Sequence, residues 1–205
     1  ASQRIQSGMA DIIIAGGTES MSMVPVMGYK TALNYKIATE NPDYYTSMGL
    51  TAEQVSKQYG ISREAQDQFS FESHVKAAAA WKSGKFTAEV VPITVRETFV
   101  GADMKKQTRE FVVATDEGIR ADATVEGLAK LKPAFAQGGT VTAGNSSQTS
   151  DGAAFVIVMS DRMMKQLNLK PVARMMSYAV AGVEPRIMGI GPVAAIPKVL
   201  KQAGM

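Results

Sequence analysis

The chain has 205 residues, of which 45% are hydrophobic and 20% charged, and its net charge of +3 is too weak and dispersed to indicate nucleic-acid binding. It contains no cysteine, which excludes disulfides, thiolate metal sites and a cysteine nucleophile supplied by these residues. No apolar run approaches the roughly 20 residues of a membrane helix and no signal-peptide pattern is present, so we expect a soluble, intracellular protein, cytoplasmic if bacterial.

The first half of the chain predicts one strand followed by a mixed helical region. Residues 11–17, DIIIAGG, form an apolar run with little alternation, which suits a strand buried on both faces of a parallel sheet. Residues 23–42 show no period and predict an irregular excursion. A capping box that begins at Thr51 predicts a helix to about residue 60, and Ser62 is expected to cap a longer helix to about residue 83. His74 lies in this longer helix and is interpreted as a surface or boundary residue.

The second half predicts short strands and helices. Residues 89–97 read as an edge strand because they contain Pro92, the stretch to 108 as a hairpin loop, and 111–114 as another strand. Arg120 precedes a short helix that ends near residue 130, and it could pair with a carboxylate, stack on a nucleotide base or hold a phosphate. Further elements are expected as strands at 155–159 and 172–181, a helix at 161–167 with Asp161 as its cap, and a last helix that begins near 192 or 196 and ends with a cap at Gly204.

A dense polar loop follows residue 140. Gly144 permits a sharp turn or a close approach to a ligand, and the six polar side chains of residues 145–150 could form a hydrogen-bonding cradle. Composition alone favours a plain surface loop. The AGGTES segment at 15–20 is not a GxGxxG fingerprint, so a dinucleotide site is not expected.

Five further stretches act together as a signature: AGGTESMS (15–22), MGLTAEQV (48–55), KLKPAF (130–135), TAGNSSQTSDGAA (142–154) and GVEPRIMGIGP (182–192). They occur in the order found in thiolases, and together they resemble the 3-ketoacyl-CoA branch of that family. The resemblance implies an α/β fold of layered α-β-α-β-α type, made of two similar halves with a mixed α+β loop domain inserted in the first.

On this resemblance the chain is an internal fragment. Residues 1–22 would end the N-terminal half, 23–139 would form the loop domain, 140–170 would return to the N-terminal half and 171–205 would start the C-terminal half. The nucleophilic cysteine of the family would precede Ala1, and the catalytic histidine and second cysteine would follow Met205.

The implied activity of the intact protein is acyl transfer to CoA by thiolytic cleavage of 3-ketoacyl-CoA, in fatty-acid β-oxidation. CoA and 3-ketoacyl-CoA would be its small-molecule partners, with CoA as co-substrate, no covalently bound cofactor and no metal. No catalytic residue of the family matches this segment, so we expect no thiolysis from the 205 residues alone. Homo-oligomers are expected, as in the family.

Seven residues match CoA- or substrate-binding positions of the family. Ser147 matches a serine that bonds the pantetheine, Arg120 an arginine packed on the adenine, and Met188 a residue near the reacting acyl group. Positions along the pantetheine tunnel are matched by Met48, Ala134, Phe135 and Ala143. Ser47 and Gly127 stand where the acetoacetyl-CoA branch has histidine and serine, which favours the 3-ketoacyl branch.

Two alternatives stay open. One is a non-catalytic thiolase-like protein that binds acyl-CoA or lipid. The other is a hydrolase that uses Ser146 or Ser147 with His74 and Asp151, although the second glycine of a nucleophile elbow is missing. The single histidine and scattered carboxylates argue against a metal enzyme.

Overall fold

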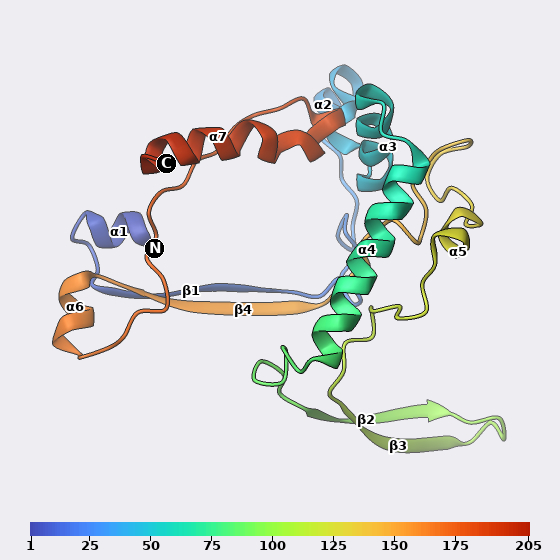
Figure 1. Cartoon of the computed structure of the whole chain (residues 1–205), viewed down its shortest axis with the longest axis horizontal. Helices are drawn as coiled ribbons and strands as arrows, with labels where there is room; N and C mark the ends of the chain where they lie inside the picture. The colour runs from blue at the N-terminus through green and yellow to red at the C-terminus, as the bar shows by residue number, and fades with distance from the viewer. The chain divides into compact units, whose positions relative to one another are not determined.

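The computed structural model describes residues 1–205, which divide into two compact units (Figure 1). We call residues 1–55 and 147–205 the ladder unit and residues 56–146 the α4 unit. The α4 unit contains α4 (Arg63–Lys82), β2 (Ile93–Val100), β3 (Lys106–Val113) and α5 (Val125–Ala129). The ladder unit contains α1 (Ser2–Gln6), β1 (Ile12–Glu19), α2 (Tyr35–Glu40), the 3₁₀ helix η1 (Pro42–Tyr45), most of α3 (Met48–Tyr59), β4 (Gly152–Met159), α6 (Asp161–Gln166), the 3₁₀ helix η2 (Pro185–Ile190) and α7 (Gly191–Ala203).

β1 and β4 form a two-stranded antiparallel sheet, although most of the chain lies between them in sequence (Figure 1). Their pairing runs from Ile12 opposite Met159 to Glu19 opposite Gly152. Both predicted strands are therefore confirmed, but the prediction that residues 11–17 are buried in a parallel sheet is wrong, since β1 pairs with an antiparallel strand and Ile14 is 70% exposed. Phe155 and Ile157 are each 64% exposed. In a two-stranded sheet, apolar side chains pack against little besides their cross-strand neighbours, so most of their surface stays in contact with solvent.

α4 follows its sequence signals closely. The Ser62 hydroxyl accepts a hydrogen bond from the amide of Ala65 at 3.2 Å, and Glu64 places a negative charge in the first turn, where the helix dipole favours it. The helix ends at Lys82, and the chain turns away at Gly84, whose φ of +72° is left-handed. The predicted cap and both ends of this helix are confirmed.

α3 begins three residues before the predicted capping box. The Thr51 amide donates to the Ser47 carbonyl at 2.9 Å, as an interior helical residue does. Thr51 is buried and its hydroxyl has no hydrogen-bond partner, so the prediction that it caps the helix is wrong. The residues from Met48 onward already have helical backbone, and the end of the helix at Tyr59 and Gly60 agrees with the prediction.

β2 and β3 form an antiparallel hairpin that extends further than predicted. It pairs Ile93 with Val113 at one end and Val100 with Lys106 at the other, so most of the expected loop before residue 108 is strand. On one face, Arg109 donates to Glu97 at 2.6 Å and lies 5.5 Å from the centre of the Phe99 ring. This exposed ion pair and cation–π contact link the two strands.

The C-terminal segment differs from prediction in its strand and agrees in its last helix. Residues 172–181 form no strand, since no neighbouring strand pairs with them. α6 is capped by the Ser160 hydroxyl, which accepts from the Met163 amide at 3.3 Å, rather than by Asp161. α7 ends as expected at Gly204, with a left-handed φ of +74°. No helix in the chain is both long and apolar enough to span a membrane.

Candidate functional site

A buried carboxylate on α4 organises the polar loop that follows residue 140. Asp67 is only 1% exposed, and both of its oxygens are hydrogen-bonded. Arg63, one turn earlier on the helix, donates to Oδ2 at 2.7 Å, and the Asn145 side-chain amide donates to Oδ1 at 3.0 Å. This satisfies the rule that a buried charge is paired and hydrogen-bonded.

Asn145 shapes the loop as well as joining it to α4. Its side-chain oxygen accepts from the Thr142 amide at 2.7 Å, and its side-chain nitrogen donates to the Thr140 carbonyl at 3.0 Å. Ser146 donates to the Thr142 carbonyl at 2.7 Å. Three of the six side chains expected to form a ligand cradle thus bond the protein itself, since Ser147, although exposed, donates to the Gln148 carbonyl at 3.1 Å.

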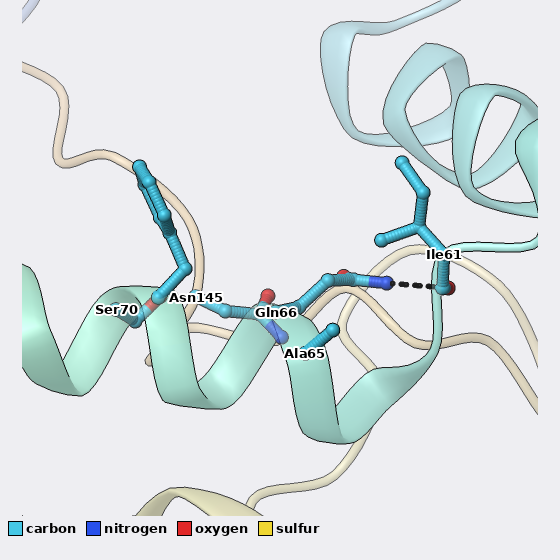
Figure 2. A pocket seen from close by; sticks show the side chains of 6 residues that line it. Ile61, Ala65, Gln66, Ser70 and Asn145 are labelled. Carbon is cyan, nitrogen blue, oxygen red and sulfur yellow. Dashed lines mark hydrogen bonds between the residues drawn. The ribbon is translucent and has the colours of Figure 1, made fainter.

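A second set of hydrogen bonds joins the start of α4 to the same loop. The Gln66 side-chain nitrogen lies 3.0 Å from the hydroxyls of Ser56 and Thr140. It also donates to the Ile61 carbonyl at 3.3 Å (Figure 2). An open hollow of about 330 Å³ lies here, lined by Ile61, Ala65, Gln66, Phe69, Ser70 and Asn145. None of the seven predicted binding residues lines it, so the hollow is not the site that the sequence predicted.

The structure brings three of the predicted tunnel residues into one part of the α4 unit. Pro133 pairs with Thr142 in an isolated bridge, and the Ala134 amide donates to the Val141 carbonyl at 2.9 Å. The segment that carries Ala134 and Phe135 therefore lies beside the segment that leads to Ala143. Phe135 is 46% exposed, so its ring is open to contact with a ligand.

Side chains of the protein pack closely against Gly144 in this arrangement. A Cβ atom at this position would lie 2.5 Å from the side chains of Leu128 and Leu131. Arg63 donates to the carbonyls of the same two leucines, at 2.6 and 3.1 Å. A close approach is thus observed at Gly144, but it is made by α5 and the residues that follow it; the approach to a ligand stays a prediction.

Arg120 lies in the segment between β3 and α5, within the α4 unit. It is exposed, its carbonyl accepts from the Ala123 amide at 3.1 Å, and its own amide donates to His74 Nδ1 at 3.2 Å. His74 is half-buried on α4, which agrees with its interpretation as a boundary residue. No sequence pattern predicted its contact with Arg120, because the two residues are distant along the chain.

The other three predicted residues belong to the ladder unit. Met48 is the first residue of α3 and is 60% exposed, while Met188 lies in η2 and is 47% exposed. Ser147 begins the second part of this unit. Four residues further on, Asp151 accepts from the Ser22 amide at 2.9 Å and the Ser22 hydroxyl at 2.5 Å, and these bonds lower the pKa of Asp151.

The contacts argue against the hydrolase alternative. Ser146 donates to a backbone carbonyl, His74 Nδ1 accepts from a backbone amide, and Asp151 accepts from Ser22. No Ser–His–Asp relay is formed by these partners. The chain also contains no group of three or more His, Cys, Asp or Glu side chains placed to hold a metal ion.

Comparison with known proteins gives matches along the whole chain. The family model for the N-terminal domain of thiolase matches residues 1–162, and that for the C-terminal domain matches residues 169–205. The 3-ketoacyl-CoA thiolase of Bacillus subtilis is 52% identical over 205 residues, which are 100% of this chain and 52% of that protein. An acetyl-CoA acetyltransferase of Chromobacterium violaceum is 46% identical over 216 residues, covering 100% of this chain and 53% of that protein.

Solved structures agree with these matches. The dimeric peroxisomal thiolase of Saccharomyces cerevisiae has a TM-score of 0.83 and 36% identity, over 100% of this chain and 50% of that one. Human mitochondrial 3-ketoacyl-CoA thiolase has a TM-score of 0.77 and 37% identity, over 99% of this chain and 52% of that one. The chain thus spans about half the length of the relatives it matches, and its fold is the α/β fold of part of a thiolase. It belongs to the thiolase family.

Proposed function

We propose that this chain is part of a 3-ketoacyl-CoA thiolase, which transfers an acyl group to CoA by thiolytic cleavage of a 3-ketoacyl-CoA. The observation that carries the proposal is the 52% identity, along the entire chain, to a relative named 3-ketoacyl-CoA thiolase. Ser47 and Gly127, where the acetoacetyl-CoA branch has histidine and serine, support the same branch. The 3-ketoacyl-CoA would be formed in fatty-acid β-oxidation, and CoA would be the co-substrate rather than a bound cofactor.

Within that enzyme, the role proposed for this chain is to bind CoA. Arg120 would lay its planar guanidinium on the adenine, which its exposure permits. Ser147 would hydrogen-bond the pantetheine, since its hydroxyl is exposed and its present partner is only the neighbouring backbone carbonyl. The remaining contacts would be apolar and would come from Met48, Ala134, Phe135, Ala143 and Met188.

The chemistry needs a nucleophile from elsewhere in the protein. Thiolysis proceeds through a covalent acyl intermediate on a thiolate, and these 205 residues contain no cysteine. The proposed division of the chain keeps residues 23–139 as the inserted loop domain, with 1–22 and 140–170 in the N-terminal half and 171–205 in the C-terminal half. The whole enzyme is proposed to be a homo-oligomer.

A chimera tests this function directly. The 205 residues replace the matching segment of the Bacillus subtilis relative, so that the flanking parts supply the catalytic groups. We expect the chimera to cleave 3-ketoacyl-CoA in a CoA-dependent reaction, whereas the 205-residue chain alone should show no thiolysis. A chimera that folds like the parent enzyme but cleaves no 3-ketoacyl-CoA would overturn the assignment in favour of a non-catalytic acyl-CoA or lipid-binding relative.

Matched variants separate CoA binding from folding. In the chimera, Arg120→Ala and Ser147→Ala should each raise the KM for CoA by about tenfold, the effect of losing one good contact. Arg96→Ala, at an exposed arginine of the β2–β3 hairpin outside the proposed site, is the control and should leave that KM unchanged. If the chimera does not fold, calorimetric titration of the 205-residue chain with CoA decides whether the chain binds CoA.

A further inference from the structure

One face of α4 holds two segments that lie far apart in the sequence. Arg63, Asp67 and His74 are spaced four and seven residues apart, which places them on the same side of a helix. Asp67 bonds Asn145 in the polar loop, and His74 bonds the Arg120 amide. The helix thus fixes the loop that leads to Ser147 and also the turn that carries Arg120.

The donor and the acceptor in the contact between His74 and Arg120 are both defined. A backbone N–H can only donate, so the His74 Nδ1 atom, 3.2 Å away, is the acceptor and carries no proton in this contact. The ring hydrogen of the neutral imidazole is then on Nε2. The bond is to the backbone of Arg120, so the contact leaves the guanidinium available to a ligand.

The segment around Arg120 is otherwise shaped by short-range bonds. The Gly118 amide donates to the Asp116 side chain at 3.0 Å, and the Ala123 amide donates to the Arg120 carbonyl at 3.1 Å. Thr124 then caps α5 by accepting from the Gly127 amide at 3.0 Å. These bonds form local turns, whereas the bond from the Arg120 amide to His74 joins this segment to a long, regular helix.

We propose that His74 is a positioning residue for CoA: through Nδ1 it holds the Arg120 backbone so that the guanidinium lies where the adenine binds. This inference rests on the proposed function, because it needs Arg120 to contact the nucleotide. His74 itself touches no reacting atom. Losing the bond should weaken binding of the nucleotide part of CoA and leave binding of the pantetheine part as it was.

Two substitutions distinguish this role by geometry. In His74→Asn, the side-chain oxygen is attached to Cγ, as Nδ1 is in histidine, and it can accept the same bond. In His74→Gln, the oxygen lies one bond further out, near the place of Nε2. Exposed Lys76 on the same helix provides matched controls, Lys76→Asn and Lys76→Gln, for the change in helix propensity.

The experiment measures dissociation constants of the 205-residue chain for CoA, adenosine 3′,5′-bisphosphate and pantetheine by calorimetry, and exchange of the Arg120 amide proton by NMR. We expect His74→Gln to expose the Arg120 amide to exchange and to raise both nucleotide constants roughly threefold to tenfold, the range for one hydrogen bond. His74→Asn should stay within about twofold of the parent chain, and pantetheine should bind all variants alike.

The outcomes separate the two proposals. If the parent chain binds neither CoA nor the bisphosphate, CoA binding by this chain fails, and the amide exchange still reports on the bond. If the parent chain binds CoA but His74→Gln binds it equally well, only the role of His74 is overturned. A parallel loss of pantetheine binding in His74→Gln would also overturn it, since that pattern indicates general disruption.

Discussion

The α4 unit and the ladder unit keep their parts in place by different means. In the α4 unit, the buried residues include the polar side chains of Asp67 and Thr142, and side-chain hydrogen bonds join the helix to the loop. In the ladder unit, the backbone pairing of β1 with β4 joins two segments that lie far apart in the sequence, and the apolar side chains of these strands remain largely exposed. Buried side-chain hydrogen bonds thus hold the loop in the α4 unit, whereas backbone hydrogen bonds hold the two strands together in the ladder unit.

This difference predicts which substitutions each unit tolerates. A network of buried polar groups is sensitive to loss of any member, because a buried group that loses its partner cannot form a replacement hydrogen bond with water. A backbone ladder is indifferent to most side chains and is sensitive where a new atom would meet the backbone of the opposite strand. The loop that precedes Ser147 is held by the first kind of structure.

The largest expected effect comes from Asp67→Asn. This change removes the charge that pairs with Arg63 at 2.7 Å. The Arg63 side chain is only 19% exposed, so its charge is left largely buried without its partner. We expect a loss of about 3 kcal/mol in the free energy of unfolding, typical of breaking a buried ion pair from one side. Urea unfolding of the 205-residue chain measures this loss as a lower urea concentration at the midpoint of unfolding.

Glu97→Gln supplies the matched control in the same unit. Glu97 also pairs with an arginine, Arg109, at 2.6 Å, but both side chains are about half exposed. Its loss should cost at most about 0.5 kcal/mol. Equal costs for the two variants would show that burial does not set the strength of the Asp67 contact.

A smaller effect is expected in the ladder from Gly16→Ala. A Cβ atom at Gly16 would collide with the Phe155 ring and the Ala154 backbone oxygen on the opposite strand. Relieving the collision requires the strands to move, so we expect a loss of about 2 kcal/mol. Thermal unfolding, with amide exchange along β1, measures it.

Two further glycines calibrate that prediction. At Gly17 a Cβ atom would meet nothing within 4 Å, so Gly17→Ala should be close to neutral. At Gly144 the two closest atoms would be the ends of two leucine side chains, which can shift, so Gly144→Ala should fall between the other two. The ladder would not behave as described if Gly16→Ala and Gly17→Ala had equal effects.

The sequence predicted local features of this fold well because their causes are local. The cap at Ser62 and the left-handed glycine at the end of α7 depend on neighbouring residues, and both are present. The strand predicted at 172–181 is absent because a strand needs a partner. A pattern of alternating residues cannot say whether a partner is within reach.

The candidate site was predictable only in part, for the same reason. The motifs indicated Arg120, Ser147 and the tunnel residues through resemblance. The residues that hold these segments, above all Asp67 and His74, are separated from their partners by dozens of positions and match no motif. In the sequence, Asp67 is one polar residue among many on a helix, and only its burial of 99% reveals its role.

The smallest expected effect concerns pH and the ladder unit. The Ser22 hydroxyl, followed by the Ser22 amide, lowers the pKa of Asp151 from its ordinary 3.8. A lowered carboxyl pKa gives stabilisation that is fully present above pH 3.8 and is lost as the pH falls through the lowered value. In Ser22→Ala, the pKa of Asp151 should rise toward 3.8, as an NMR titration of its carboxyl carbon would measure.

Ser7→Ala is the control for this titration. The Ser7 hydroxyl is exposed in the same unit and donates to the Arg4 carbonyl, so its removal should leave the pKa of Asp151 unchanged. An unchanged pKa in Ser22→Ala as well would mean that the hydroxyl does not stabilise the carboxylate.

The long separation of the paired strands has a consequence for biosynthesis. Residues 20–151, including the whole α4 unit, must leave the ribosome after β1 and before β4 can begin. At ordinary rates of translation this takes on the order of ten seconds. During that time the edge of β1 that pairs with β4 is open, while the α4 unit can already form its own contacts. An open strand edge can pair with another chain, so nascent β1 needs protection until β4 emerges.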